Sequence, residues 1–173
     1  SSALARPELC DLAKQALAFD EAAFDPERAC WRDLREGSPE TTAWCHGAPG
    51  MALALQRILR RRPAEQAIYR SRLEAALQNI RHFGGGGSHC LCHGALGNAE
   101  PLLDASGDNR ALGLGLIDRA LAEAQAEGRW RGGIADYEWH PGLMIGVAGI
   151  GLQLLRVAAP EVASVLVLER QQP

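Results

Sequence analysis

Two short stretches of this 173-residue chain place a histidine directly after a cysteine, and the two stretches align without a gap. Residues 45–50 and residues 92–97 share the pattern Cys-His-Gly-Ala-x-Gly, and the two cysteines lie 47 positions apart. Cysteine thiolates and histidine imidazoles are ligands that zinc prefers in proteins. Their repeated pairing therefore predicts the protein side of a zinc site that handles thiolates.

Three of these side chains make the best ligand set. Cys45 and Cys92 occupy equivalent positions of neighbouring repeats and are expected to point at a common axis. His93 follows at the start of a helix, where neighbouring side chains can both turn inward. Two cysteines and one histidine leave one zinc coordination position open, as in catalytic sites. A substrate thiol bound there would lose its proton and stay nucleophilic.

Other interpretations of these residues stay open at this point. A single buried cysteine is more often a small core residue than a ligand, and only the repetition of the pattern favours a metal site. His46 can act as a general acid or base, contact the substrate or simply pack. As a fourth ligand, His46 would instead close the site into a structural one. His89 and Cys90 are expected in a loop near the mouth of the site.

The elements that must position these residues are helices arranged in repeats. Gly-x-x-Gly recurs at 47/50, 94/97 and 146/149, and each occurrence starts an apolar helix that pairs with an amphipathic one. A period near 50 residues with two helices per unit is typical of helical-hairpin arrays, in which the apolar helix is buried inside. Helices are expected over 8–19, 51–59, 64–82, a segment ending near 103, 110–127 and 142–157. A loop is expected over 20–43, with an extended tail over 165–169.

Composition agrees with a helical protein and excludes several functions. Hydrophobic residues make up 47% of the chain, mostly Ala and Leu, and aromatic residues only 5%. This balance favours helices over sheet. A net charge of -3 argues against nucleic-acid or membrane-surface binding, and no apolar run is long enough to span a bilayer. Five cysteines are an odd number, which in a cytoplasmic protein favours free thiols or metal ligands over disulfides.

Three motifs together resemble the lanthionine synthetase C-like (LanC-like) cyclases. They are residues 44–50, residues 92–98 and the glycine-rich segment 141–151, and the closing segment 164–169 is similar to the end of the class II (LanM-type) lanthipeptide synthetases. The resemblance implies an all-α fold, an α/α toroid of helical hairpins with zinc at the N-terminal face of the inner helices. Residues 1–173 would form the C-terminal portion of the cyclase domain, with further hairpins and a dehydratase domain upstream.

The resemblance also implies a reaction and its partners. Zinc bound by Cys45, Cys92 and His93 would activate a cysteine thiolate of a dehydrated lanthipeptide precursor for addition to dehydroalanine or dehydrobutyrine. The product is a lanthionine or methyllanthionine thioether of a lantibiotic precursor. His46 is the candidate for a supporting catalytic role, since the family's proton-transfer motifs are not found in this chain. The expected setting is the cytoplasm, without nucleic acid, and with an export transporter at the membrane as a further contact.

Two rival functions remain at the level of sequence. One is a non-catalytic LanC-like protein that binds glutathione or a partner through its zinc, and the other is a helical-repeat piece with a structural zinc. The pattern at the start of the chain resembles half a repeat, so we expect the chain to bind zinc weakly and to cyclise peptides poorly without further repeats. Replacing Cys92 with Ala should unfold the chain if the zinc is structural, and should leave the helices intact if it is catalytic.

Overall fold

The computed structural model describes residues 7–35, 42–61, 66–134 and 140–167. The elements in this part are helices α1 (Pro7–Ala22), α2 (Ala48–Arg61), α3 (Gln66–Phe83), α4 (Ala95–Leu103), α5 (Asp108–Glu127) and α6 (Val147–Ala158), with two short strands, β1 (Phe24–Asp25) and β2 (Cys30–Trp31). The expected all-α class is confirmed. No described helix has both the length and the apolar character needed to cross a membrane.

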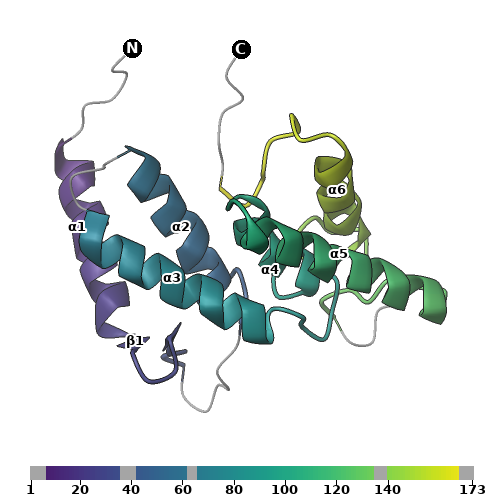
Figure 1. Cartoon of the computed structure of the whole chain (residues 1–173), viewed down its shortest axis with the longest axis horizontal. Coiled ribbons are helices and arrows are strands. Elements are labelled where there is room, and N and C mark those ends of the chain that lie inside the picture. The colour runs from purple at the N-terminus through teal and green to yellow at the C-terminus, as the bar shows by residue number, and fades with distance from the viewer. Residues whose placement is uncertain (1–6, 36–41, 62–65, 135–139, 168–173) are drawn as a thin grey trace.

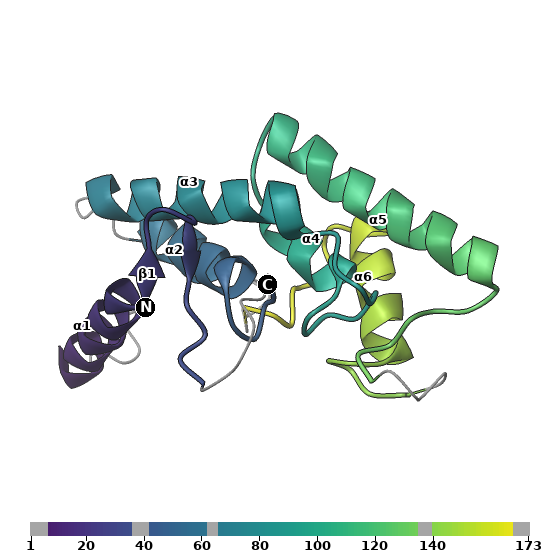
Figure 2. The same ribbon diagram turned by 90° about the horizontal axis from the view of Figure 1, so that it is seen from below.

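Helices α2 with α3 and α4 with α5 form two successive helical hairpins (Figure 1). In Figure 2, α3 and α5 run along one side of the molecule while α2, α4 and α6 lie along the other. Helix α4 is the best covered of them, and every residue from Ala95 to Leu102 is buried. It contacts α2 on one side and α6 on the other. This arrangement confirms the expected alternation of an apolar helix with a solvent-facing one.

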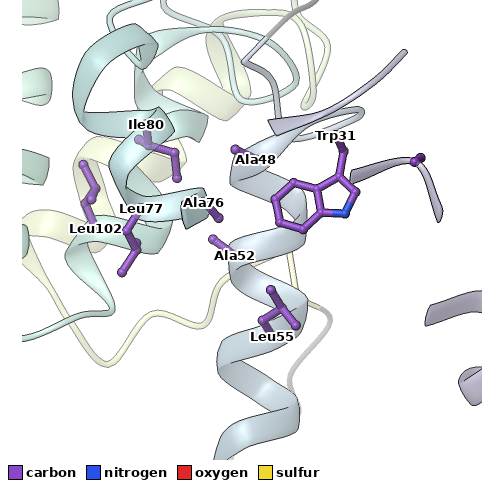
Figure 3. Close-up of a cluster of buried hydrophobic side chains, with 9 residues drawn as sticks. Trp31, Ala48, Ala52, Leu55, Ala76, Leu77, Ile80 and Leu102 are labelled. Carbon is purple, nitrogen blue, oxygen red and sulfur yellow. The ribbon is translucent and has the colours of Figure 1, made fainter. Parts of the chain in front are cut away.

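Small residues let α2 and α3 approach closely. Ala48 and Ala52 lie one turn apart on α2 and face the side of α3 that carries Ala76 and Ile80 (Figure 3). Both alanines of α2 are almost fully buried, at 1% and 0% exposed. The Trp31 indole covers the other side of α2. This cluster joins the first hairpin to the β1–β2 strand pair.

The segment between α1 and α2, expected as a loop, contains a small antiparallel strand pair. Phe24 lies opposite Trp31, and their rings meet edge to face with centroids 4.9 Å apart. The Asp25 carboxylate accepts backbone N–H bonds from Glu27 and Arg28 and thereby closes the turn. Strands of two residues are too short to show an alternation of polar and apolar residues, so this pair could not be predicted from periodicity.

A buried polar cluster joins α6 to α4. Glu100 is 3% exposed, forms an ion pair with Arg156, and accepts a hydrogen bond of 2.7 Å from Gln153 Nε2. A carboxylate this deep requires such partners, because an unpaired buried charge is costly. The same polar cluster therefore fixes the position of the third repeat against the second.

After α6 the chain turns back to the first repeat. An extended tail is expected over 165–169, but residues 165–167 form a turn, and residues 168 and 169 lie outside the described part of the chain. The carbonyl of Leu166 accepts a hydrogen bond of 3.2 Å from the Trp44 indole N–H. Leu166 packs with Leu53 and Leu91 in a core cluster that also includes Met144. The described tail thus contacts all three repeats beneath the turns that precede α2, α4 and α6.

Candidate metal centre

Cys45, Cys92 and His93 converge in the structure. Cys45 lies in the turn before α2, and the other two lie in the turn before α4. One ligand atom from each side chain lies within 4.8 Å of the others. Ligand atoms around a tetrahedral zinc ion stand about 3.5–3.8 Å apart, as zinc–sulfur and zinc–nitrogen bond lengths require. The group could therefore hold a metal ion after side-chain movements of about 1 Å.

Backbone hydrogen bonds between the repeats bring the two turns together. The Cys45 N–H donates to the Cys92 carbonyl over 3.3 Å, and the Cys92 N–H donates to the Met144 carbonyl over 2.8 Å. Met144 holds the position in the third turn that the cysteines hold in the first two. The three turns thus form a short backbone ladder. Residues at equivalent positions of successive repeats therefore lie close together in space.

A glycine in the first turn of each inner helix makes this ladder sterically possible. A Cβ atom on any of these glycines would collide with the carbonyl oxygen six residues earlier. The distances would be 2.2 Å from Gly50 to Trp44, 1.8 Å from Gly97 to Leu91 and 1.8 Å from Gly149 to Leu143. Each of these carbonyls belongs to the residue before a ligand position or its third-repeat equivalent. The glycines therefore bring the helix start against the turn that carries the ligands.

A carbonyl group from a distant loop orients His93. The Nε2 atom of His93 lies 3.0 Å from the Gly133 carbonyl oxygen. A carbonyl only accepts, so Nε2 carries the hydrogen and Nδ1 remains free to bind a metal. A Cβ on Gly133 would come within 2.8 Å of the His93 ring. Metal-binding histidines usually donate their second N–H in this way, so the local structure suits a ligand.

His46 contacts the thiol of Cys45 and is itself held by a charged pair. Its Nδ1 lies 3.1 Å from Cys45 Sγ, and its Nε2 lies 3.2 Å from Arg35 Nη2. A guanidinium only donates, so Nε2 accepts and the neutral ring donates from Nδ1 to the sulfur. Arg35 is fixed in turn by Asp33, through a hydrogen bond of 2.9 Å from Nε. His46 is not among the three candidate ligands that converge.

Burial and the neighbouring Cys45 side chain disfavour ionisation of the Cys92 thiol in the metal-free protein. Burial, followed by a hydrogen bond and charge from Cys45 and charge from Cys90, raises the pKa of Cys92 to about 12. Two neighbouring sulfurs therefore do not both become thiolates at neutral pH without a cation to balance them. Binding a divalent metal would remove this penalty, because the metal favours the deprotonated ligand.

A cavity of about 1010 Å³ reaches the centre, and both His46 and His93 line it. Its apolar surface includes Trp31 and Phe83, and its polar surface includes Gln78 among other side chains of α3. This volume is at the upper end of the range for ligand pockets. The centre is therefore accessible to a substrate larger than a free amino acid.

Several positions differ from what the sequence suggested. His89 and Cys90 lie in a loop, as expected, but both are buried, at 1% and 0% exposed. Asn98, the last residue of the motif over residues 92–98, has a role that the motif alone does not predict. Its side chain is fully buried and donates to the carbonyls of Thr42 and Gly84, which holds the segment before Cys45 in place. A polar amide near the start of an apolar helix is a signal in the sequence that could have indicated this role.

Comparison with known proteins agrees with the motifs. A family model described as lanthionine synthetase C-like protein matches residues 2–169, far more than half of the chain. No curated protein matches the chain at a significant level.

Proposed function

This chain belongs to the lanthionine synthetase C-like family, and we propose that it carries the zinc site of a lanthipeptide cyclase. The activity would be the closure of thioether rings in a dehydrated precursor peptide, in the complete protein. The observation that supports this proposal most directly is the convergence of Cys45, Cys92 and His93. Sulfur and nitrogen donors in this number are the set that zinc takes in catalytic sites with one open position.

Zinc bound at these residues would act as a Lewis acid that lowers the pKa of a peptide cysteine and holds it as a thiolate. Other residues of the chain hold the ligands in position and admit the substrate. Gly133 fixes the His93 ring through its carbonyl. His46 donates a hydrogen bond to Cys45, which keeps this sulfur in its ligating position. The large cavity beside His46 and His93 admits the peptide segment that carries both reacting groups.

The proposed reaction conserves all atoms of the peptide. The thiolate sulfur forms a bond to the β-carbon of dehydroalanine or dehydrobutyrine, and the carbon–carbon double bond breaks. Its electron pair moves to the α-carbon and carbonyl as an enolate, and a proton is then added at the α-carbon. The thiol proton released earlier balances this step, so the product has the mass of the substrate. His46 is the described histidine closest to the Cys45 thiol and is the candidate to assist with this proton.

Metal binding is the first test of the proposal. The purified chain, titrated with zinc or with cobalt as a coloured substitute, should take up one metal ion, with the absorption typical of thiolate ligands. Cys92→Ala should abolish this uptake and leave the helical circular dichroism largely unchanged. Uptake that survives in Cys92→Ala would show that the metal binds elsewhere. Loss of the helical signal in that variant would instead favour a structural zinc.

Ring formation is the second test. Because cyclisation leaves the mass unchanged, a dehydrated precursor is treated afterwards with a thiol alkylating reagent, which labels only cysteines that have not reacted. The complete protein should protect the cysteines from the label, and the 173-residue chain should do so only slowly. If zinc binds while no form of the protein cyclises the peptide, the protein would be a thiol-binding relative without catalysis. Binding of glutathione to the metal-loaded chain would then identify that function.

A further inference from the structure

His89 is a buried histidine to which the proposed reaction gives no role. It lies on the segment before the second ligand turn and is 1% exposed. Its ring meets the Trp130 indole edge to face, with centroids 5.5 Å apart. Its partners, Glu123 on α5 and Arg131 in the following loop, are both only partly exposed and form an ion pair with each other. A polar group this deep needs such partners to avoid a desolvation penalty.

The hydrogen bonds around His89 fix both its tautomer and its neighbour. The Arg131 backbone N–H donates to the ring atom Nδ1 of His89 over 3.1 Å, and the His89 backbone N–H donates to the Arg131 carbonyl over 2.8 Å. Since Nδ1 accepts, Nε2 carries the hydrogen and donates to the Glu123 carboxylate over 3.3 Å. The guanidinium of Arg131 also donates to the Gly87 carbonyl over 3.0 Å. Residue 131 is therefore held by backbone and side-chain bonds at once.

The anchored residue lies two positions before the residue that orients His93. Gly133 accepts from His93 Nε2 over 3.0 Å, and its own N–H donates to the Ile145 carbonyl over 2.7 Å. The described residues between α5 and 134 contain no helix or strand, so these contacts define the path of the segment. His89 holds one end of residues 131–133, and Ile145 holds the other.

We propose that His89 is a positioning residue for the metal ligand His93. It anchors the loop at Arg131 and thereby places the Gly133 carbonyl where it fixes the Nε2–H tautomer of His93, leaving Nδ1 for the metal. The inference rests on the proposed metal site. Displacement of the Gly133 carbonyl would allow the other tautomer, in which Nδ1 carries a hydrogen and cannot ligate. His89, four positions upstream of His93, thus holds in place the Gly133 carbonyl that orients His93.

Substitutions at His89 and Glu123 separate this role from a general effect on folding. His89→Ala removes both ring hydrogen bonds, whereas His89→Asn places an amide oxygen near the former Nδ1 and can still accept from the Arg131 N–H. We expect His89→Ala to weaken cobalt or zinc affinity about tenfold, in the range known for residues that orient ligands. His89→Asn should retain affinity within about threefold of the unchanged chain, since one hydrogen bond is retained. Glu123→Ala, at a half-exposed position, should give an intermediate loss.

The control removes a comparable interaction far from the centre. Arg72→Ala breaks the ion pair between α3 and Glu21 of α1. It should lower the melting temperature without changing metal affinity, measured well below the melting temperature. If His89→Ala is too unstable to study, Glu123→Ala and His89→Asn still give the ordering. Both lose the contact between residue 89 and the Glu123 carboxylate, but only Glu123→Ala also removes the ion pair that Glu123 forms with Arg131.

Nitrogen NMR of the metal-free chain provides a readout that does not depend on metal. In the unchanged chain, His93 should show the Nε2–H tautomer, and His89→Ala should shift it toward a mixture. Identical His93 signals and identical metal affinity in the two proteins would overturn the inference while leaving the metal site intact. Failure of the unchanged chain to bind metal would instead count against the proposed function, and the His93 tautomer would still decide the positioning role.

Discussion

Gly97 offers a sharp test of how the repeats are built. In Gly97→Ala, the added Cβ would lie 1.8 Å from the Leu91 carbonyl oxygen, 2.6 Å from its carbonyl carbon and 2.9 Å from its Cα. All three atoms belong to the backbone, so no rotamer change relieves the contact. Either α4 must move away from the ligand turn by more than 1 Å or the turn must be rebuilt.

The cost of this movement follows from where it takes place. Leu91 and Leu96 on the two sides of the contact are both 0% exposed, and α4 is packed against α2, α5 and α6. Overpacking a close-packed interior typically costs 1–3 kcal/mol, and more where backbone has to shift. We expect Gly97→Ala to lower the free energy of unfolding by about 3 kcal/mol or more. With a urea dependence of about 2 kcal/mol per molar, the unfolding midpoint should fall by about 1.5 M.

The matched control is Gly115→Ala in the middle of α5. Nothing lies within 4 Å of a Cβ at this exposed position, so the substitution should stabilise the chain by about 0.5–1 kcal/mol through helix propensity. Urea unfolding followed by circular dichroism measures both variants. Gly50→Ala and Gly149→Ala should behave like Gly97→Ala because they occupy the equivalent contact. A Gly97→Ala protein as stable as the unchanged chain would refute the steric reasoning for all three.

Two further predictions concern the centre and the ion pairs of the fold. His46→Phe keeps the ring but removes the hydrogen bond to Cys45, so metal affinity should fall about threefold to tenfold in a chelator competition, and an unchanged affinity would contradict the supporting role. Asp104→Asn should cost about 1–2 kcal/mol at neutral pH, because Asp104 accepts a hydrogen bond of 2.6 Å from Arg57. Burial alone would raise the pKa of Asp104, but hydrogen bonds and charge from Arg60 and Arg57 outweigh it and lower the pKa below 3.8. The stabilisation is therefore complete above this value and is lost as the pH falls through the lowered pKa, so the urea midpoints of the two proteins should converge in acid; a difference that persists there would contradict the assignment.

The convergence of the three candidate ligands and the helical repeat could be predicted from the sequence because both rest on local signals. Cys45, Cys92 and His93 stand in a motif that occurs twice, and residues in equivalent places of stacked repeats come together by the symmetry of the stack. The helix expected over residues 110–127 is observed as Asp108–Glu127. The expectations for zinc itself and for repeats beyond this chain stay predictions.

The segments whose secondary structure differs from the expectation have weak or ambiguous local signals. Residues 142–146 continue the apolar run of the third repeat and were expected to be helical. They instead form the turn before α6, with Gly146 in extended conformation as its N-cap. A Cβ atom added at Gly146 would lie only 1.9 Å from the His140 carbonyl oxygen. Close packing of the backbone therefore fixes this turn. Propensity and periodicity do not record such contacts.

The sequence by itself determined which side chains can ligate a metal and which helices present them. Only the tertiary structure decided what orients these ligands. The Gly133 carbonyl reaches His93 across 40 positions, and Arg35 reaches His46 across 11. A backbone carbonyl is present in every residue and leaves no trace in the sequence, and an arginine on a loop is a common surface residue. Their roles arise because chain folding brings a particular donor within hydrogen-bonding distance of a particular acceptor, and that distance is a property of the packed repeats.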